Sequence, residues 1–103
     1  MANNLQDMEK LLCRSIEERR ILIINYKDEP ERLIEPYIYG KDVNGLKLSA
    51  YQISGYSGSG TVPEWKLFKV ELINHVKQLD WKFTVRKTYN PDFEIVTKVF
   101  CKV

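Results

Sequence analysis

The sequence has little of what most catalytic and metal sites need. It holds one histidine and two cysteines among 103 residues, and Cys13 and Cys101 form no metal-binding or redox spacing. His75 has no acidic residue or cysteine at a telling distance, so we expect an ordinary strand residue there. No pair of carboxylates is placed for acid–base chemistry, and the glycines lack the strand–loop–helix context of a phosphate-binding loop. The sequence therefore predicts no enzyme, no metal and no cofactor.

Long apolar segments are also missing. The longest purely apolar run is Ile21-Leu22-Ile23-Ile24, whereas about 20 residues are needed to span a bilayer. The first residues show no basic region followed by an apolar core, so we expect no signal peptide. We expect Cys13 and Cys101 to be buried or free thiols, with a disulfide between them as the alternative. These features together predict a cytoplasmic protein that has no membrane partner.

Composition and charge indicate one globular domain over residues 1–103. Hydrophobic residues make up 44% and charged residues 29% of the chain, which is typical of a folded domain. Residues 1–65 carry eight basic and ten acidic side chains, and residues 66–103 carry eight basic and four acidic ones. The C-terminal excess of +4 favours an anionic partner, although it is too weak for a dedicated duplex-DNA binder. Solvated lysines between strand positions are the alternative explanation.

Hydrophobic periodicity predicts a helix followed by five strands. Apolar residues recur at helical spacing over about 4–18, where Asn3 and Gln6 offer a cap. Strands are expected at about 21–26, 31–39, 46–56, 65–70 and 75–81, with one helical turn at 71–73. The pair Asn44-Gly45 predicts a tight hairpin between the second and third strands.

The C-terminal residues 83–103 are expected to form an extension with a short helix. Asn90-Pro91-Asp92 has the features of a helix start, and apolar residues follow at helical spacing up to Val103. A strand is the alternative, because many of these residues are β-branched. The fold class is mostly β (α+β), a small five-stranded barrel of the Sm-like or Src-homology-3-like kind over about 20–82. A barrel this small has no channel, so a ligand must bind in an outer groove or a seam.

Aromatic and basic residues alternate along the expected strands. Rings can stack on bases while lysine and arginine neutralise phosphate, as in nucleotide or single-strand binding. The other interpretation is that most rings form the core and the basic residues line its rim. Both interpretations stay open for the set Tyr26, Tyr37, Tyr39, Tyr51, Tyr56, Trp65, Arg32, Lys47, Lys66 and Lys69.

Three segments in this order resemble the WYL domain, a bacterial ligand-sensing module built on a small Sm-like barrel. The first has Arg32 two residues before Ile34 and four before Pro36. The second, Leu46-Lys47-Leu48-Ser49-Ala50-Tyr51, stands where the family has Trp-Tyr-Leu-x-Ala-Tyr. The third, Lys66-Leu67-Phe68-Lys69-Val70-Glu71-Leu72-Ile73, stands where the family has Arg-x-Phe-Arg-Leu-x-Arg-Ile, so two arginines become lysine and the third becomes Leu72. The match covers about residues 5–82, and the tail that begins with Tyr89-Asn90-Pro91 is similar to the ending of short, stand-alone members.

The resemblance implies a non-catalytic regulatory module that binds a small anionic, nucleotide-like effector. In the family the basic strand positions line the ligand pocket, which here implies ligand binding by Arg32, Tyr51, Lys66 and Lys69. Lys66 and Lys69 lie three residues apart on one strand and nominally face opposite sides, so we expect only one of them in the pocket. Such a module would act through a protein partner or as a homo-oligomer. The alternatives are a structural assembly module without a ligand and an Sm-like binder of short single-stranded nucleic acid.

Overall fold

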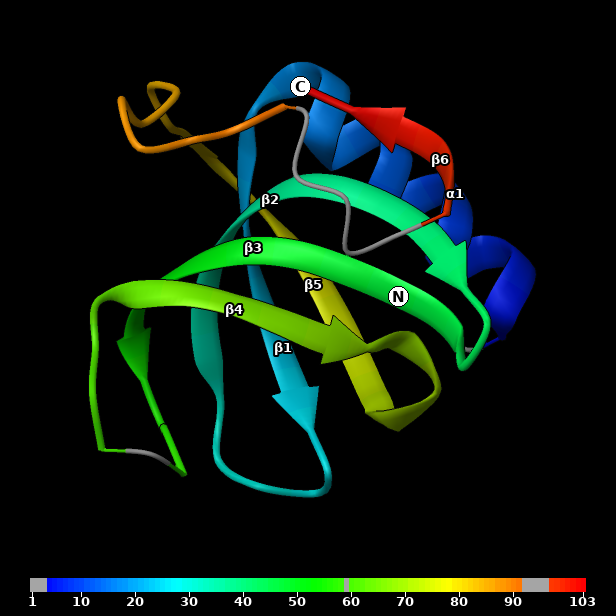
Figure 1. The fold of residues 1–103 in the computed structure, drawn as a ribbon. Helices are drawn as coiled ribbons and strands as arrows, with labels where there is room; N and C mark the ends of the chain where they lie inside the picture. Colours follow the sequence, from blue (N-terminus) through cyan, green and yellow to red (C-terminus); the bar gives the residue numbers. More distant parts are fainter. Residues whose placement is uncertain (1–3, 59, 92–96) are drawn as a thin grey trace.

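The computed structural model describes residues 4–58, 60–91 and 97–103, and it begins with one amphipathic helix (Figure 1). Helix α1 spans Leu5–Glu18, as the periodicity predicts. Its cap is Asn4 instead of the expected Asn3, and the Asn4 side chain accepts a hydrogen bond of 2.8 Å from the Asp7 amide. Capping of this kind satisfies one of the free N–H groups of the first turn. The helix buries its apolar side, which includes Leu12 and Ile16.

An antiparallel sheet makes up most of the remaining chain. The strands are β1 (Arg20–Tyr26), β2 (Arg32–Asp42), β3 (Gly45–Gly55), β4 (Glu64–Lys69), β5 (Ile73–Lys82) and β6 (Lys98–Lys102). They are arranged in the order β4-β3-β2-β1-β5, and β6 pairs with β2 outside this path. A short 3₁₀ turn, η1 (Val70–Leu72), joins β4 to β5, where one helical turn was expected. The described residues therefore form a small, mostly β domain with one N-terminal helix.

The hairpin between β2 and β3 is confirmed. Asp42 pairs with Gly45, and the Asn44 amide donates a 2.7 Å hydrogen bond to the Asp42 side chain. Gly45 has φ of 121°, a backbone conformation that favours glycine. This turn determines which residues of β3 face each side of the sheet, and it therefore decides where the candidate site residues lie.

The expected closed barrel is wrong, because the sheet stays open between β4 and β5. Turn η1 carries the chain directly from the one edge strand to the other, and β5 pairs with β1 instead of β4. At the end of β4 the Lys69 amide donates to the Tyr26 hydroxyl at 3.0 Å, so a side chain replaces a strand partner there. Closure requires a continuous ladder around the sheet, and this pair of strands does not provide it.

The expected C-terminal helix is also wrong over the described part, since residues 98–102 form strand β6. Residues 92–96, where that helix was to begin, lie outside the described residues. Strand β1 pairs with only the first part of β2, so the backbone groups at Ile38–Lys41 need another partner and β6 provides it. The approach is close at Gly40, where an added Cβ would lie 2.2 Å from the Lys98 carbonyl oxygen. The hydrogen bonds that residues 98–102 form with the unpaired part of β2 therefore outweigh the helical preference that their sequence pattern indicates.

A disulfide joins Cys13 of α1 to Cys101 of β6, so the expectation of free thiols is wrong. The two cysteines lie 88 residues apart in the sequence, and their Cα atoms are 5.6 Å apart. Sequence spacing alone gave no sign of this proximity, because it depends on β6 lying beside α1. The bond removes the reason for expecting a reducing compartment, where disulfides are rare.

Two hydrophobic clusters lie on opposite faces of the sheet. The larger one, which we call the helix-side core, packs α1 against the sheet and contains Leu12, Ile34, Leu48 and Phe68 among others. The smaller one, which we call the outer cluster, is built around Tyr37 and Phe83, with Tyr51, Trp65 and Tyr89 packed against it. Because strand residues alternate between faces, a shift of one position moves a side chain from the one cluster to the other.

Candidate functional site

The structure does not bring the four expected site residues together. Strand β4 pairs with β3 so that Lys66 lies opposite Ala50, a member of the helix-side core, and Trp65 lies opposite Tyr51. Side-chain alternation therefore puts Lys66 on the helix side and Tyr51 on the outer face. Lys69 follows the outward alternation of Trp65, whereas Arg32 packs at the helix-side core. The expectation that Lys66 and Lys69 face opposite sides agrees with this register.

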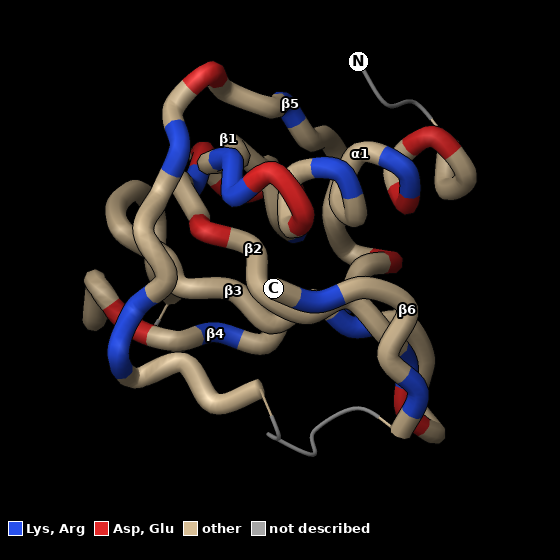
Figure 2. The backbone as a smooth tube through the Cα atoms, turned by 90° about the horizontal axis from the view of Figure 1, so that it is seen from above, with Lys and Arg blue, Asp and Glu red and all other residues tan. Residues whose placement is uncertain are grey.

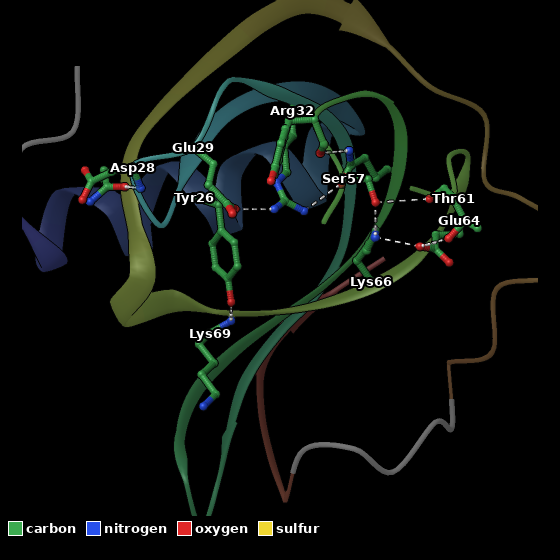
Figure 3. A network of polar contacts seen from close by, with 12 residues as sticks. Tyr26, Asp28, Glu29, Arg32, Ser57, Thr61, Glu64, Lys66 and Lys69 are labelled. Carbon is green, nitrogen blue, oxygen red and sulfur yellow. Dashed lines mark hydrogen bonds and ion pairs between the residues drawn. The ribbon is translucent and has the colours of Figure 1, made fainter. Parts of the chain in front are cut away.

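The two terminal nitrogens of Arg32 are already hydrogen-bonded within the protein. It is 5% exposed, and its guanidinium donates to Glu29 Oε1 at 2.8 Å and to Gln52 Oε1 at 3.3 Å. The group also lies within 6 Å of the rings of Tyr26 and Phe68, at 5.2 and 5.6 Å from their centres. Its Nε atom is buried without a hydrogen-bond partner. The fork that could grip a phosphate is thus occupied by the protein itself (Figure 3).

The two expected lysines have different surroundings. The Lys66 ammonium lies 2.6 Å from Glu64 and 2.9 Å from the Ser57 hydroxyl, so it is ion-paired at the helix side. The Lys69 side chain extends away from Arg32 (Figure 3). No carboxylate of the described residues lies within ion-pair distance of Lys69. Lys69 is therefore the better placed of the two to meet an anion from outside.

Aromatic rings gather at the outer face beside Tyr51. The Tyr37 ring centre lies 4.7 Å from that of Trp65 and 4.8 Å from that of Tyr89. Tyr51 meets Trp65 edge to face at 5.2 Å. Ring contacts of this kind are stabilising and hold the ring planes in defined orientations. Tyr89, which belongs to the C-terminal extension, was not expected in a site.

A cavity of about 290 Å³ opens beside these rings. Its lining includes Ser49, Trp65, Leu67 and Tyr89, so it lies between the outer face of β3 and β4 and the segment that follows β5. The Trp65 indole N–H donates a 2.9 Å hydrogen bond to the Thr88 hydroxyl and thereby ties this segment to β4. Ligand sites usually measure about 300–1,000 Å³, so this volume suits one small ring system.

An ion pair between Arg86 and Glu35 contacts the rings of Tyr51 and Tyr37. Glu35 is 4% exposed, and Arg86 donates to both of its carboxylate oxygens at 3.0 Å. The Arg86 guanidinium also lies 4.3 Å from the Tyr51 ring centre, which is a cation–π contact. The Tyr37 hydroxyl donates to Glu35 at 3.1 Å and accepts from the Arg86 amide at 3.1 Å. Burial raises the pKa of Tyr37 to about 12, and the neighbouring Glu35 carboxylate adds to the rise.

Basic residues near the cavity are mostly neutralised within the protein. Lys47, which lies opposite Lys69, is buried and binds both Asp42 oxygens at 3.0 and 3.2 Å. This contact with Lys47 holds the pKa of Asp42 below its ordinary value. Figure 2 shows Lys and Arg spread over α1, β4 and β6 rather than gathered on one element. Among the residues that line the cavity the lysine is Lys66, whereas Lys69 lies two residues beyond the lining Leu67 on the same face of β4.

Three structural findings bear on metal ligands, on the single histidine and on membrane spans. The described residues contain no group of three or more His, Cys, Asp or Glu side chains that could hold a metal ion. His75 is exposed on β5. None of the helices in this part of the chain is both long enough and apolar enough to cross a bilayer.

Sequence reasoning missed Glu35, Arg86 and Tyr89 because their contacts are far apart in the chain. Arg86 meets Glu35 across 51 residues, and nothing in the local pattern around either residue indicates the pair. The one available signal was the count of basic residues after residue 66, which gave charge but no position. A search against protein-family models found no match for the chain, and comparisons with curated proteins and with solved structures found none either.

Proposed function

We propose that this protein is a non-catalytic regulatory module that binds a small anionic, nucleotide-like effector in the outer cavity. The observation that carries the proposal is a ring-sized cavity, walled by Trp65, Leu67 and Tyr89, on the same strand face as Lys69. Aromatic walls suit a planar ring, and a nearby lysine suits an anionic group. The resemblance to the WYL domain points to the same ligand class.

The spacing along β4 fits a ligand with a ring at one end and an anion at the other. Leu67 and Lys69 are two residues apart, or about 6.6 Å along an extended strand. A planar ring held beside Trp65 and Leu67 would therefore have its phosphate or carboxylate near the Lys69 ammonium. A lysine supplies a point charge without the two-pronged grip of arginine, so affinity should be modest.

The four expected site residues differ in the contacts that each would have to break in order to bind a ligand. Arg32 would have to give up its hydrogen bond with Glu29 to hold a phosphate, and Lys66 would have to leave Glu64. Lys69 carries neither cost, and Tyr51 contributes by packing against Trp65. We therefore assign ligand contact to Lys69 and Trp65, and structural support to Arg32, Tyr51 and Lys66.

Signal output would need a protein partner or a second copy of the chain, as the resemblance implies. A cytoplasmic location stays part of the proposal, although it must accommodate the disulfide between Cys13 and Cys101. The assembly alternative has one supporting observation: β4 pairs only with β3 among the described strands, and its Leu67 is 41% exposed. Exposed strand edges are sites where chains can pair.

Equilibrium titration tests the proposal. Adenosine and guanosine monophosphates and short oligothymidylates are titrated into the oxidised protein at low and moderate salt. Lys69→Ala should weaken mononucleotide binding about tenfold or more, since a charge-assisted contact contributes about 1.5–3 kcal/mol. Lys77→Ala, which removes an exposed lysine on β5, is the matched control and should bind as the wild type does.

Three outcomes would redirect the proposal. If the wild type binds none of the probes, the effector proposal fails, and a concentration-dependent dimer in sedimentation would then favour the assembly alternative. If oligothymidylate binds much more tightly than any mononucleotide, with a steep salt dependence, the single-strand alternative is favoured. If Arg32→Ala abolishes binding without loss of folding, while Lys69→Ala has no effect, the ligand lies at the helix side instead.

A further inference from the structure

The segment that walls the outer cavity is fastened to the C-terminal end of β6. The Tyr89 hydroxyl donates a 3.3 Å hydrogen bond to the Val103 carbonyl oxygen. The Val103 amide in turn donates a 2.9 Å hydrogen bond to the Tyr37 carbonyl oxygen, and Tyr37 lies beneath both Trp65 and Tyr89. The position of one cavity wall thus depends on where the last residue of the chain is docked.

The disulfide links β6 covalently to α1, and the strand is also held by its ladder with β2 and by the contact of the Phe100 ring with Tyr39. The strand is five residues long and, among the strands that the structure describes, it pairs with β2 alone. Of these five residues only Cys101 is buried, and its partner Cys13 belongs to α1 on the helix side. Short edge strands with exposed side chains open locally at low cost, so a covalent bond at Cys101 matters more here than it would in a central strand.

We propose that the disulfide between Cys13 and Cys101 controls the outer cavity, so that ligand binding at Trp65 depends on the redox state of this pair. The inference rests on the proposed function for the identity of the ligand, although not for the coupling itself. In the reduced protein, β6 separates from β2 more often, Val103 leaves its bonds, and Tyr89 loses the hydrogen bond that its hydroxyl makes with Val103. Binding weakens because this aromatic wall is then held less firmly beside the ring of the ligand.

The chemistry needs only a dithiol as the reductant. One thiolate of the dithiol attacks a sulfur of the protein disulfide and displaces the first cysteine as its thiolate; the second thiolate then attacks the mixed disulfide and displaces the second cysteine. The dithiol loses two electrons and two protons to become a cyclic or protein disulfide, and Cys13 and Cys101 gain them as two thiols. Access is through Cys13, which is partly exposed, whereas Cys101 is 8% exposed.

The fluorescence of Trp65 reports on the solvent exposure of the cavity wall in the absence of any ligand. The chain has two tryptophans, and Trp81 is 61% exposed on β5, so the Trp81→Phe protein reports on Trp65 alone. Acrylamide quenching is compared between the oxidised protein and the protein reduced with dithiothreitol, together with far-ultraviolet circular dichroism. We expect the quenching constant of Trp65 to at least double on reduction while the dichroism spectrum is retained. Adenosine monophosphate should bind at least fivefold more weakly to the reduced form.

Two further variants separate coupling from a general loss of structure. The Cys13→Ala/Cys101→Ala protein should resemble the reduced form and should not respond to dithiothreitol. Tyr89→Phe removes the hydroxyl that reaches Val103, so its quenching should change less on reduction than that of the parent.

Equal quenching in the oxidised and reduced proteins would overturn the inference. Unfolding of the whole protein on reduction would overturn it as well, because the coupling must be local. If quenching responds as expected while adenosine monophosphate binds neither form, the coupling stands and the ligand proposal fails.

Discussion

Reduction of the disulfide should lower the free energy of unfolding by an amount that the structure sets. Cys13 and Cys101 are separated by 88 residues, so the bond closes most of the chain into one loop. The loop-entropy relation for a closure of this length gives about 4.5 kcal/mol at 25 °C, chiefly because the cross-link restricts the unfolded chain. Domains of this size are stable by about 5–15 kcal/mol, so the reduced protein should remain folded but marginal.

Urea denaturation of the oxidised and dithiothreitol-treated proteins measures this difference. With a denaturant slope near 1.3 kcal/mol per molar, the midpoint should fall by about 3.5 M. The thermal midpoint should fall by about 20 °C. The Cys13→Ala/Cys101→Ala protein serves as the control and should show no response to the reductant. A change below about 1 kcal/mol, together with two reactive thiols in the untreated native protein, would refute the disulfide and the entropic reasoning together.

Three further perturbations probe the outer face and the β6 edge. Arg86→Ala should lower the free energy of unfolding by about 2–3 kcal/mol in urea denaturation, because it leaves the buried Glu35 carboxylate without its main partner, whereas Lys87→Ala should have little effect. A loss as small as that of the control would show that Glu35 is not desolvated. Tyr37 keeps its proton to about pH 12 in the folded state, whereas an unfolded tyrosine loses it near pH 10. Stability should therefore fall as the pH rises from 10 to 12, and Tyr37→Phe should flatten that fall; an unchanged slope would contradict the shift. Gly40→Ala should cost about 1–3 kcal/mol and speed hydrogen exchange of the β6 amides, because the added methyl group meets the backbone of β6; unchanged exchange would argue against the close approach.

The elements that local sequence controls could be predicted. The helix over 4–18 follows from apolar spacing, and α1 spans Leu5–Glu18; the cap is Asn4, however, one residue after the expected Asn3. The hairpin follows from Asn44-Gly45, two residues that accept a positive φ, although only Gly45 of this pair has one and it is already paired with Asp42. Both features depend on interactions between residues a few positions apart, which a single sequence displays.

Elements that depend on distant partners could not be predicted. Residues 98–102 fit a helical pattern, yet they form β6 because β2 has a free edge and Gly40 lets the backbone approach. Barrel closure failed for a related reason, since the partner of β5 is β1 rather than β4. Neither outcome follows from the residues of the segment itself, because the competing structures differ in tertiary contacts and not in local preference.

The sequence indicated which kinds of residue lie at the candidate site, but it did not identify which particular residues they are. Aromatic and basic residues on adjacent strands were expected, and Tyr51 does lie beside Trp65 on β4. Strand register, however, sends Arg32 to the helix side, where Glu29 occupies its guanidinium. Tyr89 reaches the site from the C-terminal extension, which the resemblance to a known family did not connect with ligand binding. Burial and pairing of each charge decide which residues can meet a ligand, and these depend on the complete fold.

Nuclear magnetic resonance of the oxidised, ¹⁵N-labelled protein tests the ligand site most directly. The indole N–H of Trp65 bonds to Thr88 at the cavity, so its resonance reports any ligand that enters. Titration with adenosine monophosphate should shift this signal and the amides of Leu67 and Lys69 in a saturable manner, and Lys69→Ala should reduce the affinity about tenfold. The exposed indole of Trp81 should not move. Shifts confined to the surroundings of Arg32, or no saturable shift at Trp65 with any nucleotide, would contradict the outer cavity as the binding site.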